Sequence, residues 1–218
     1  MASIPVARGR TAVRIFPTSL VAVVERIAAT LALIAVSPVL CACAAVLALQ
    51  SGQSPLIAHR RVGWRGSTLW MLKLRTMWDD AQDRGRFRWI EPIDDQAGPL
   101  QKDADDPRVP SAFARFCRRH SVDELPQLLH VILGEMALIG PRPLTAGELE
   151  RYYGRDAEEI LEAKPGLAGL WQISGRNRLT YSERRDLDLR LVRDGSLRTS
   201  LRVLVGSLAQ VWTGENSW

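Results

Sequence analysis

Residues 27–49 read IAATLALIAVSPVLCACAAVLAL and contain no charged side chain. A helix needs about 20 apolar residues to cross the hydrocarbon core of a bilayer, so this run is long enough for a membrane helix. A cleaved signal peptide is the first alternative, but its apolar region is usually shorter and lies closer to the N-terminus. The run therefore predicts a helix embedded in a membrane.

Two features indicate that this helix enters and leaves the membrane on the same side. Ser37-Pro38 lies in the middle of the run, where proline removes a backbone hydrogen bond and a serine hydroxyl can satisfy the freed carbonyl. Basic residues flank the run on both sides, which favours a cytoplasmic position for both flanks. These residues are Arg8, Arg10, Arg14 and Arg26 before the run and Arg60, Arg61 and Arg65 after it. We therefore predict a re-entrant helical hairpin over residues 20–50, with an ordinary transmembrane span as the alternative.

The composition restricts the partners and the chemistry of the chain. Its 29 Lys and Arg residues exceed its 24 Asp and Glu residues, and such a surplus favours phosphate groups or anionic lipid surfaces as partners. Three cysteines without metal-ligand spacing argue against a disulfide framework and a zinc site, and they fit a reducing compartment. The three histidines are scattered, so a histidine metal cluster is not expected. No nucleic-acid-binding motif is recognisable, so nucleic acid is not an expected partner.

The rest of the chain is predicted to be helical with little sheet. The segment from Gly63 to Gly66 indicates a turn between two short extended pieces, residues 56–62 and 68–75, which predicts a hairpin. Residues 79–107 are rich in charged and turn-forming residues and predict a long loop with room for a short helix. Helical patterns then dominate, over residues 111–119, 122–133, 145–163, 180–193 and 196–212.

The last of these patterns, residues 196–212, has apolar residues on one side, so this helix either packs on the domain or lies in the membrane interface. The predicted fold class is therefore mainly α with little β. It combines a re-entrant membrane hairpin, a compact cytoplasmic domain and interfacial amphipathic helices. We divide the chain into an N-terminal segment (1–19), the membrane-embedded helix (20–50) and the cytoplasmic domain (51–218).

Two adjacent carboxylates lie at the predicted start of a helix. In RRHSVDELPQL, residues 118–128, Pro126 requires that the helix begins only a few residues before it. Asp123 and Glu124 then lie in the first turn, where the helix dipole and free backbone N–H groups stabilise negative charge. By pattern alone, a capping box between Ser121 and Glu124, or Asp123 as the cap itself, is the simpler interpretation. The two arginines just upstream favour a functional one, because carboxylates and guanidiniums together can hold a metal-bound diphosphate.

The motifs around this pair resemble those of the bacterial sugar transferase family, whose members are monotopic polyprenyl-phosphate phosphoglycosyl transferases. Six motifs agree with the family in order and spacing, and the agreement runs from about residue 20 to residue 212. They are SP at 37–38, RVG at 61–63, KLRTM at 73–77, SVDELPQL at 121–128, GPRP at 140–143 and KPGLAGLWQISGR at 164–176. The resemblance is to the minimal catalytic form of the family, so residues 51–218 are expected to be a phosphoglycosyl transferase domain.

The resemblance implies a reaction. Asp123 and Glu124 would be the catalytic pair, with Asp123 as the nucleophile that attacks the sugar-bearing phosphorus of a UDP-sugar. UMP would leave, and polyprenyl (undecaprenyl) phosphate would resolve the aspartyl phosphosugar to a polyprenyl-diphospho-sugar. A covalent intermediate divides one difficult transfer into two easier steps. The reaction would be the first membrane step of exopolysaccharide, O-antigen or glycoconjugate synthesis, on the cytoplasmic face of the bacterial inner membrane.

The resemblance also implies a Mg²⁺ cofactor and a set of binding residues. Asp123, Glu124 and Asp188 would bind the metal, although Asp188 on its own looks like an exposed helix charge. Arg142 lies between two prolines, which hold its fork in a fixed direction; the simpler alternative is a solvated side chain in a turn. The predicted substrate-binding residues are Lys73, Arg75, Arg118, Arg142, Gln172 and Arg176.

The chain departs from the family pattern at a few positions outside the catalytic pair. His59 stands where glutamine is usual, Ala58 replaces an aromatic residue, Ala168 replaces a frequent threonine and Leu191 a frequent tyrosine. The reaction class is therefore predicted, while the sugar, the glycan it enters and a homodimeric state stay open.

Two other functions compete with this interpretation. A membrane-tethered basic module that binds nucleic acid or anionic lipid would lose affinity steeply with salt and would not need Asp123. A membrane-bound phosphatase would use the same carboxylate chemistry with water as acceptor, so its product would not depend on polyprenyl phosphate.

Overall fold

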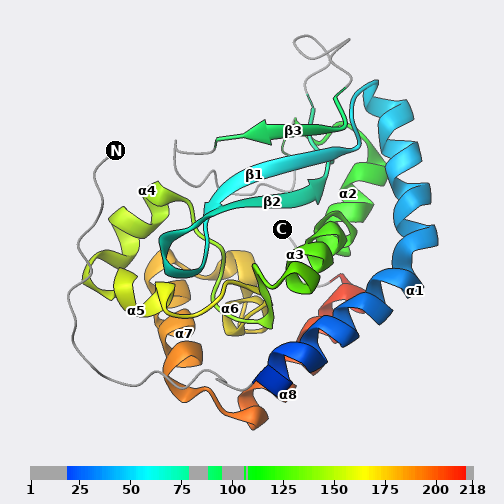
Figure 1. The fold of residues 1–218 in the computed structure, drawn as a ribbon. Coiled ribbons are helices and arrows are strands. Elements are labelled where there is room, and N and C mark those ends of the chain that lie inside the picture. Colours follow the sequence, from blue (N-terminus) through cyan, green and yellow to red (C-terminus); the bar gives the residue numbers. More distant parts are fainter. Residues whose placement is uncertain (1–18, 79–87, 95–105, 107, 215–218) are drawn as a thin grey trace.

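The computed structural model describes residues 19–78, 88–94, 106 and 108–214. The N-terminal arginines at 8, 10 and 14, and most of the loop predicted over 79–107, lie outside the described residues. The described chain is mainly helical with little sheet, as predicted. One long helix lies along one side of a domain that is built from shorter helices and two small sheets (Figure 1).

The long helix, α1, spans Ser19–Ser51 and continues through Pro38. Proline at 38 cannot donate a backbone hydrogen bond to the carbonyl of Ile34. The Ser37 hydroxyl donates to that carbonyl instead, over 2.9 Å, as the sequence predicted. Because the freed carbonyl is satisfied, the helix is not interrupted, and its axis only bends midway (Figure 1). The two halves do not fold back on each other, so the predicted hairpin is not seen within α1, and the path of α1 through a membrane stays a prediction.

The two sides of α1 differ in what covers them. Ala29, Cys43 and Leu47 are buried against the domain. The carboxylate of Glu25 also faces the domain, where it accepts a hydrogen bond of 3.1 Å from the backbone N–H of Leu138. The opposite side exposes large apolar residues, which are Leu20, Val23, Val24, Ile27, Leu31, Ile34, Val39, Val46 and Leu49. By length and composition, α1 is able to cross a membrane.

A three-stranded sheet follows α1. Strands β1 (Leu56–Val62) and β2 (Thr68–Leu74) form the predicted antiparallel hairpin, with Leu56 opposite Leu74 and Val62 opposite Thr68. The third strand, β3 (Ile90–Ile93), pairs parallel with the other edge of β1. The sequence interpretation assigned this segment to a loop. Its pairing with a strand about 30 residues earlier is a tertiary contact that leaves no local signal.

A second sheet has two parallel strands, β4 (Ala137–Ile139) and β5 (Gly166–Ala168). Here the GPRP and KPGLAG motifs meet, because the backbone N–H of Gly140 donates to Ala168 and that of Gly166 donates to Pro141. The approach is so close that a Cβ atom on Gly166 would lie 2.0 Å from the backbone nitrogen of Gly140. Only glycine fits there, and the pairing fixes where each motif leaves the sheet.

The helices surround these two sheets. The α-helices after α1 are α2 (Ala112–Arg119), α3 (Leu128–Leu133), α4 (Ala146–Glu148), α5 (Ala157–Leu161), α6 (Leu170–Ile173), α7 (Tyr181–Asp194) and α8 (Leu197–Thr213). Short 3₁₀ helices are η1 (Trp64–Gly66), η2 (Val122–Gln127), η4 (Gly154–Asp156) and η5 (Arg176–Arg178), and η3 (Leu149–Tyr153) is a π-helix. The single helix predicted over 145–163 is thus divided into four pieces, and Gly154, with a φ of +48°, interrupts it between η3 and η4.

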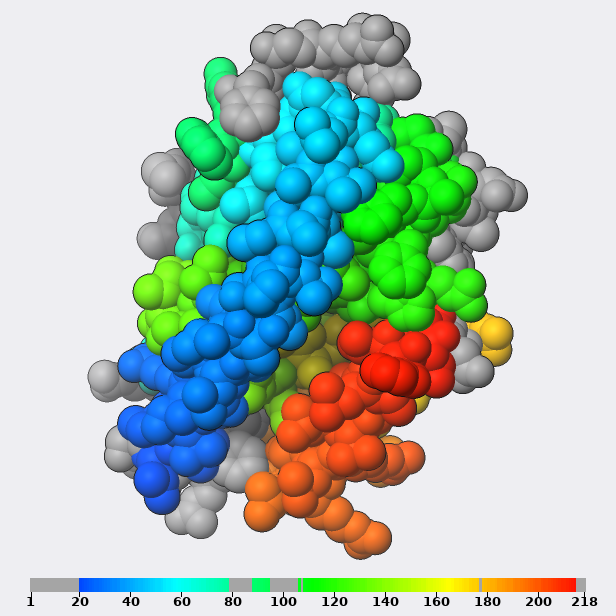
Figure 2. Space-filling view, turned by 90° about the vertical axis from the view of Figure 1, so that its right-hand side faces the viewer, coloured from blue at the N-terminus to red at the C-terminus, as the bar shows by residue number. Residues whose placement is uncertain are grey.

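Helix α8 joins the domain through one side only. Val203 is fully buried and packs in a cluster with Leu170 and Leu191, while the other side exposes Leu201 and Leu208. Figure 2 shows α8 on the same face of the molecule as α1. Of the two alternatives that the sequence left open, packing on the domain is therefore seen, while a position in the membrane interface stays a prediction. The exposed side of α8 presents a second apolar surface beside the exposed side of α1.

Candidate active site

The carboxylate pair lies where the sequence predicted, in the first turn of η2. Helix α2 ends at Arg119, and Ser121 then adopts a left-handed conformation with a φ of +54°, which turns the chain into η2. The side chain of Ser121 makes no capping hydrogen bond, so the predicted capping box is wrong. Its hydroxyl accepts a hydrogen bond from Arg176 instead. Asp123 is buried at 6% exposure, whereas Glu124 is partly exposed. The two carboxylates thus have different surroundings.

Basic side chains from three separate segments lie near η2, and one of them contacts the carboxylate pair directly. Lys73, near the end of β2, donates from Nζ to Oε1 of Glu124 over 2.8 Å. Arg176, at the start of η5, donates from Nη2 to the Ser121 hydroxyl over 2.6 Å. Arg118, at the end of α2, lies 3.5 Å from the Thr76 hydroxyl. Of the predicted substrate-binding residues, Lys73 therefore contacts Glu124, Arg176 contacts Ser121 at the start of η2, and Arg118 precedes η2 at the end of α2.

His59, on β1, reports the electrostatic character of this region. Burial first, and then the positive charges of Lys73 and Arg61, lower the pKa of His59 to about 3. Arg75 and Arg118 act in the same direction. Burial and several nearby cations both disfavour the protonated imidazole, so this side chain is neutral at working pH. The same positive potential favours binding of a multiply charged anion.

Arg75 is placed differently from the other predicted binding residues. It is buried, its Nε donates to the carbonyl of Ser54 over 2.8 Å, and its Nη2 forms an ion pair with Glu91 on β3. Its guanidinium therefore links β3 to the segment between α1 and β1. This position favours a structural role over the predicted role in substrate binding.

Arg142 lies in a second cluster, next to β4. Its backbone N–H is 3.4 Å from Oδ1 of Asp188, and its guanidinium lies 5.0 Å from the ring centre of Trp171. Glu148 approaches the guanidinium only to 3.8 Å, which is a long ion pair. Strand β1 connects this cluster to the first, because Val62 donates to the carbonyl of Leu144 over 2.8 Å. His59 belongs to the first cluster and Val62 contacts the second, and these two residues are about 10 Å apart along β1.

Asp188 is fully buried on α7, not exposed as its helical pattern suggested. It accepts a hydrogen bond of 2.8 Å from the Tyr153 hydroxyl. Burial raises the pKa of Asp188 to about 7, although the bonds from Tyr153 and Arg142 oppose that rise. Burial also raises the pKa of Tyr153. Sequence reasoning missed Tyr153, because 35 residues separate the two partners and no local pattern relates them.

Gln172 uses its amide within its own loop. Its Oε1 accepts from the backbone N–H of Gly169, and its Nε2 donates to the carbonyl of Leu167 over 3.1 Å. Its backbone carbonyl accepts from the side chain of Gln210 on α8 over 2.7 Å. The amide therefore holds the KPGLAG loop in shape, and its predicted role in substrate binding stays a prediction.

The predicted metal ligands separate into two groups. Among the described residues, no group of three or more His, Cys, Asp and Glu side chains is arranged to hold a metal ion. Asp188 is enclosed by Tyr153 and the backbone of Arg142, so it does not fit as a third ligand. Asp123 and Glu124 do fit, because Mg²⁺ is usually held by one or two carboxylates together with substrate phosphates. The donor set thus suits a metal that arrives with its substrate.

Comparison with known proteins tests the family resemblance independently of the structure. The bacterial sugar transferase family matches residues 17–214. The exopolysaccharide production protein ExoY of Sinorhizobium fredii is 38% identical over 192 residues, covering 87% of this chain and 84% of that protein. The UDP-glucose:undecaprenyl-phosphate glucose-1-phosphate transferase of Caulobacter vibrioides is 30% identical over 203 residues, covering 90% and 71%. The undecaprenyl-phosphate galactose phosphotransferase of Salmonella typhimurium is 38% identical over 159 residues, covering 71% of this chain and 33% of that protein.

Proposed function

Because this chain belongs to the bacterial sugar transferase family, we propose that it transfers a sugar 1-phosphate from a UDP-sugar to undecaprenyl phosphate. The products are undecaprenyl-diphospho-sugar and UMP, and the reaction serves exopolysaccharide or related glycan synthesis. The observation that carries the proposal is the arrangement around η2. There a buried carboxylate and a partly exposed one lie in the first turn, with Lys73, Arg118 and Arg176 gathered from three segments.

Asp123 is the nucleophile in this proposal. A carboxylate oxygen attacks the phosphorus that bears the sugar, and the bond between that phosphorus and the bridging oxygen breaks. UMP leaves with the electron pair of that bond, and an aspartyl phosphosugar remains. A phosphate oxygen of undecaprenyl phosphate then attacks the same phosphorus, and Asp123 departs as a carboxylate. The buried position of Asp123 limits access of water, which would otherwise hydrolyse the intermediate.

The neighbouring residues stabilise charge on the reacting groups. Lys73 holds the Glu124 carboxylate through its 2.8 Å ion pair and adds a positive charge beside the transferring phosphoryl group. Arg118, Arg176 and Arg142 supply guanidinium donors for the phosphate oxygens. A divalent cation held by Asp123 and Glu124 with the diphosphate would neutralise charge on the transferring phosphoryl group.

The exposed apolar surfaces of α1 and α8 position this chemistry at a membrane. Both lie on one face of the molecule (Figure 2), and both leave large aliphatic side chains uncovered. An apolar face of this size on two neighbouring helices favours the hydrocarbon boundary of a bilayer. The basic flanks of α1 favour the cytoplasmic face of the inner membrane, where UDP-sugars are available. The undecaprenyl chain then stays in lipid while its phosphate reaches Asp123.

The proposal is tested by trapping the first half of the reaction. The protein in membrane nanodiscs is mixed with a panel of radiolabelled UDP-sugars without undecaprenyl phosphate. We expect one sugar to give a burst of UMP comparable to the amount of enzyme, with the phosphosugar mass located on Asp123. The Asp123→Asn protein should give no burst, while Asp186→Asn, an exposed carboxylate on α7, should behave as wild type. A normal burst from Asp123→Asn would overturn the covalent assignment.

A further inference from the structure

Five side chains form a continuous stack that ends at Arg142. The rings of Tyr152 and Tyr181 are parallel within 10°, with centres 4.3 Å apart. The guanidinium of Arg184 lies 5.2 Å from the centre of the Tyr181 ring and 5.5 Å from that of Trp171. Arg142 lies 5.0 Å from the same Trp171 ring. Rings and guanidiniums therefore alternate from Tyr181 to Arg142, across α7, α6 and the GPRP motif.

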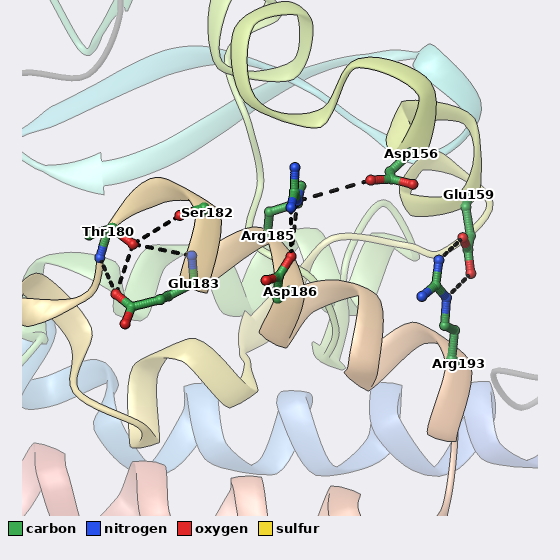
Figure 3. A network of polar contacts seen from close by, with 8 residues as sticks. All are labelled: Asp156, Glu159, Thr180, Ser182, Glu183, Arg185, Asp186 and Arg193. Carbon is green, nitrogen blue, oxygen red and sulfur yellow. Dashed lines mark hydrogen bonds and ion pairs between the residues drawn. The ribbon is translucent and has the colours of Figure 1, made fainter.

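The start of α7 fixes the first members of this stack. Thr180 caps the helix by accepting from the backbone N–H of Glu183, and the Glu183 carboxylate accepts from the backbone N–H of Thr180 over 2.7 Å. Figure 3 shows this reciprocal pair at the first turn of α7. Tyr181 and Arg184 are three residues apart and so lie on the same side of the helix. The cap therefore sets the direction of both side chains before they meet Trp171.

Ring faces hold both guanidiniums, and the Glu148 carboxylate adds only a long ion pair to Arg142. Burial first, and then the positive charge of Arg142, lower the pKa of Arg184. Within the described part of the chain, the Nε atoms of Arg142 and Arg184 are buried without a hydrogen-bond partner. Glu148, 3.8 Å from Arg142, is engaged by the backbone N–H of Thr145 over 2.9 Å. Two like charges with so little compensation favour the approach of an anion.

We propose that Arg184 and Tyr181, acting through Trp171, are positioning residues that hold the Arg142 guanidinium for a phosphate group of the donor. This inference rests on the proposed function, in which Arg142 binds the UDP-sugar. Stacking on a ring fixes the plane of a guanidinium and leaves its outer N–H donors available, whereas a carboxylate partner would occupy them. The charge of Arg184 also disfavours movement of Arg142 towards α7. The stack thus orients Arg142 without consuming its fork.

The first test separates binding from chemistry. Arg184→Met keeps the length of the side chain but removes the planar cation, and Tyr181→Leu removes the ring. We expect each to raise the KM for the UDP-sugar about fivefold and to leave kcat within about twofold, because only the placement of a binding group is lost. Tyr181→Phe keeps the ring and should retain the wild-type KM. If Arg184→Met does not fold, the comparison of Tyr181→Leu with Tyr181→Phe decides.

Matched controls come from the same helix. Arg185 and Arg193 make ion pairs with Asp186 and Glu159 on the outer surface of α7 (Figure 3). Arg185→Met and Arg193→Met each remove a positive charge from the same helix but leave the stack intact. Both should keep the wild-type KM. Equal effects of these variants and Arg184→Met would mean that net charge, not the stack, is responsible, and would overturn the inference.

A double-mutant cycle tests whether Arg184 acts through Arg142. We expect Arg142→Met to raise KM about tenfold, and the addition of Arg184→Met to that variant to have no further effect. Multiplicative effects of the two changes would refute a positioning role. Inorganic diphosphate, titrated by calorimetry, provides a readout without turnover, and its Kd should rise about fivefold in Arg184→Met.

The two readouts distinguish failure of this inference from failure of the proposed function. Diphosphate binding that depends on both arginines, with no UMP release from any UDP-sugar, would remove the proposed reaction and leave the positioning role. Normal transfer by wild type, with unchanged KM and unchanged diphosphate binding in Arg184→Met, would remove the positioning role and leave the reaction.

Discussion

Replacing Asp188 with asparagine is expected to remove a pH dependence of stability. Asp188 is fully buried, and burial raises its pKa from 3.8 to about 7 in the folded protein. Between these two pH values the folded protein keeps a proton that the unfolded chain releases, so rising pH favours unfolding. The difference corresponds to roughly 4 kcal/mol of unfolding free energy, lost progressively between about pH 4 and pH 7. The asparagine of Asp188→Asn cannot ionise, so this variant should not lose that unfolding free energy as the pH rises.

Thermal unfolding of the detergent-solubilised protein, followed from pH 4 to pH 7.5 in EDTA, measures this effect. For a chain of this size, roughly 4 kcal/mol corresponds to a fall in Tm of about 10 °C. The wild-type Tm should fall by about that much more than the Tm of Asp188→Asn. Asp186→Asn, an exposed neighbour on the same helix, should keep the wild-type slope. Parallel curves for wild type and Asp188→Asn would refute the reasoning, because the carboxyl would then titrate normally in its buried site.

The same experiment tests the assignment of the metal ligands. A magnesium ion bound directly to Asp188 would stabilise its ionised form and lower its pKa. The slope should then flatten when magnesium replaces EDTA. We expect no such change, because Tyr153 and the backbone of Arg142 already enclose the carboxyl. A flattened slope would return Asp188 to the metal site.

Four further predictions follow from the site and the membrane helix. Transfer activity should vanish in EDTA and return with magnesium, and full turnover in chelator would remove the metal from the mechanism. Ser37→Ala should lower the stability of α1 in detergent by about 1 kcal/mol, measured by thermal unfolding, because the carbonyl freed by proline loses its donor. Gly166→Ala should destabilise the fold by more than about 3 kcal/mol and give mostly aggregated protein on size-exclusion chromatography, since the added methyl group meets the backbone of Gly140. Cysteines introduced at Ser3 and Ser67 should both be labelled from the cytoplasmic face of oriented vesicles, and labelling from opposite faces would establish a span.

The elements that the sequence predicted well are those with local signals. The β1–β2 hairpin follows from two extended runs around a glycine-bounded turn, and its strands match within one residue. Helix α7 begins after a Thr180 cap and ends at Asp194, just before Gly195, which adopts a φ of +49°. Pro126 placed Asp123 and Glu124 in the first turn of η2 correctly. Each of these features depends on residues within one or two turns of each other.

The parts that could not be predicted depend on contacts between distant segments. Strand β3 exists because Ile90–Ile93 finds the free edge of β1, and its own four residues contain a proline that argues against a strand. The capping box failed because Ser121 takes a left-handed conformation that is rare for serine. The helical pattern predicted an exposed Asp188, whereas in the fold it is buried and bonded to Tyr153. In the site, the residue types were predictable, whereas their partners were not.

The packing of α1 against the domain has a consequence for the order in which the protein is made. Cys43 and Leu47 on α1 pack with Ala114 and Cys117, and Glu25 accepts from Leu138. Cys117 leaves the ribosome about 65 residues after the end of α1, which at bacterial rates of synthesis takes roughly 3 to 13 s. During that interval the domain-facing side of α1 lacks the residues that cover it in the folded protein. In the proposed membrane location, α1 would insert before the domain has folded, and its contacts with Ala114 and Cys117 would form only later.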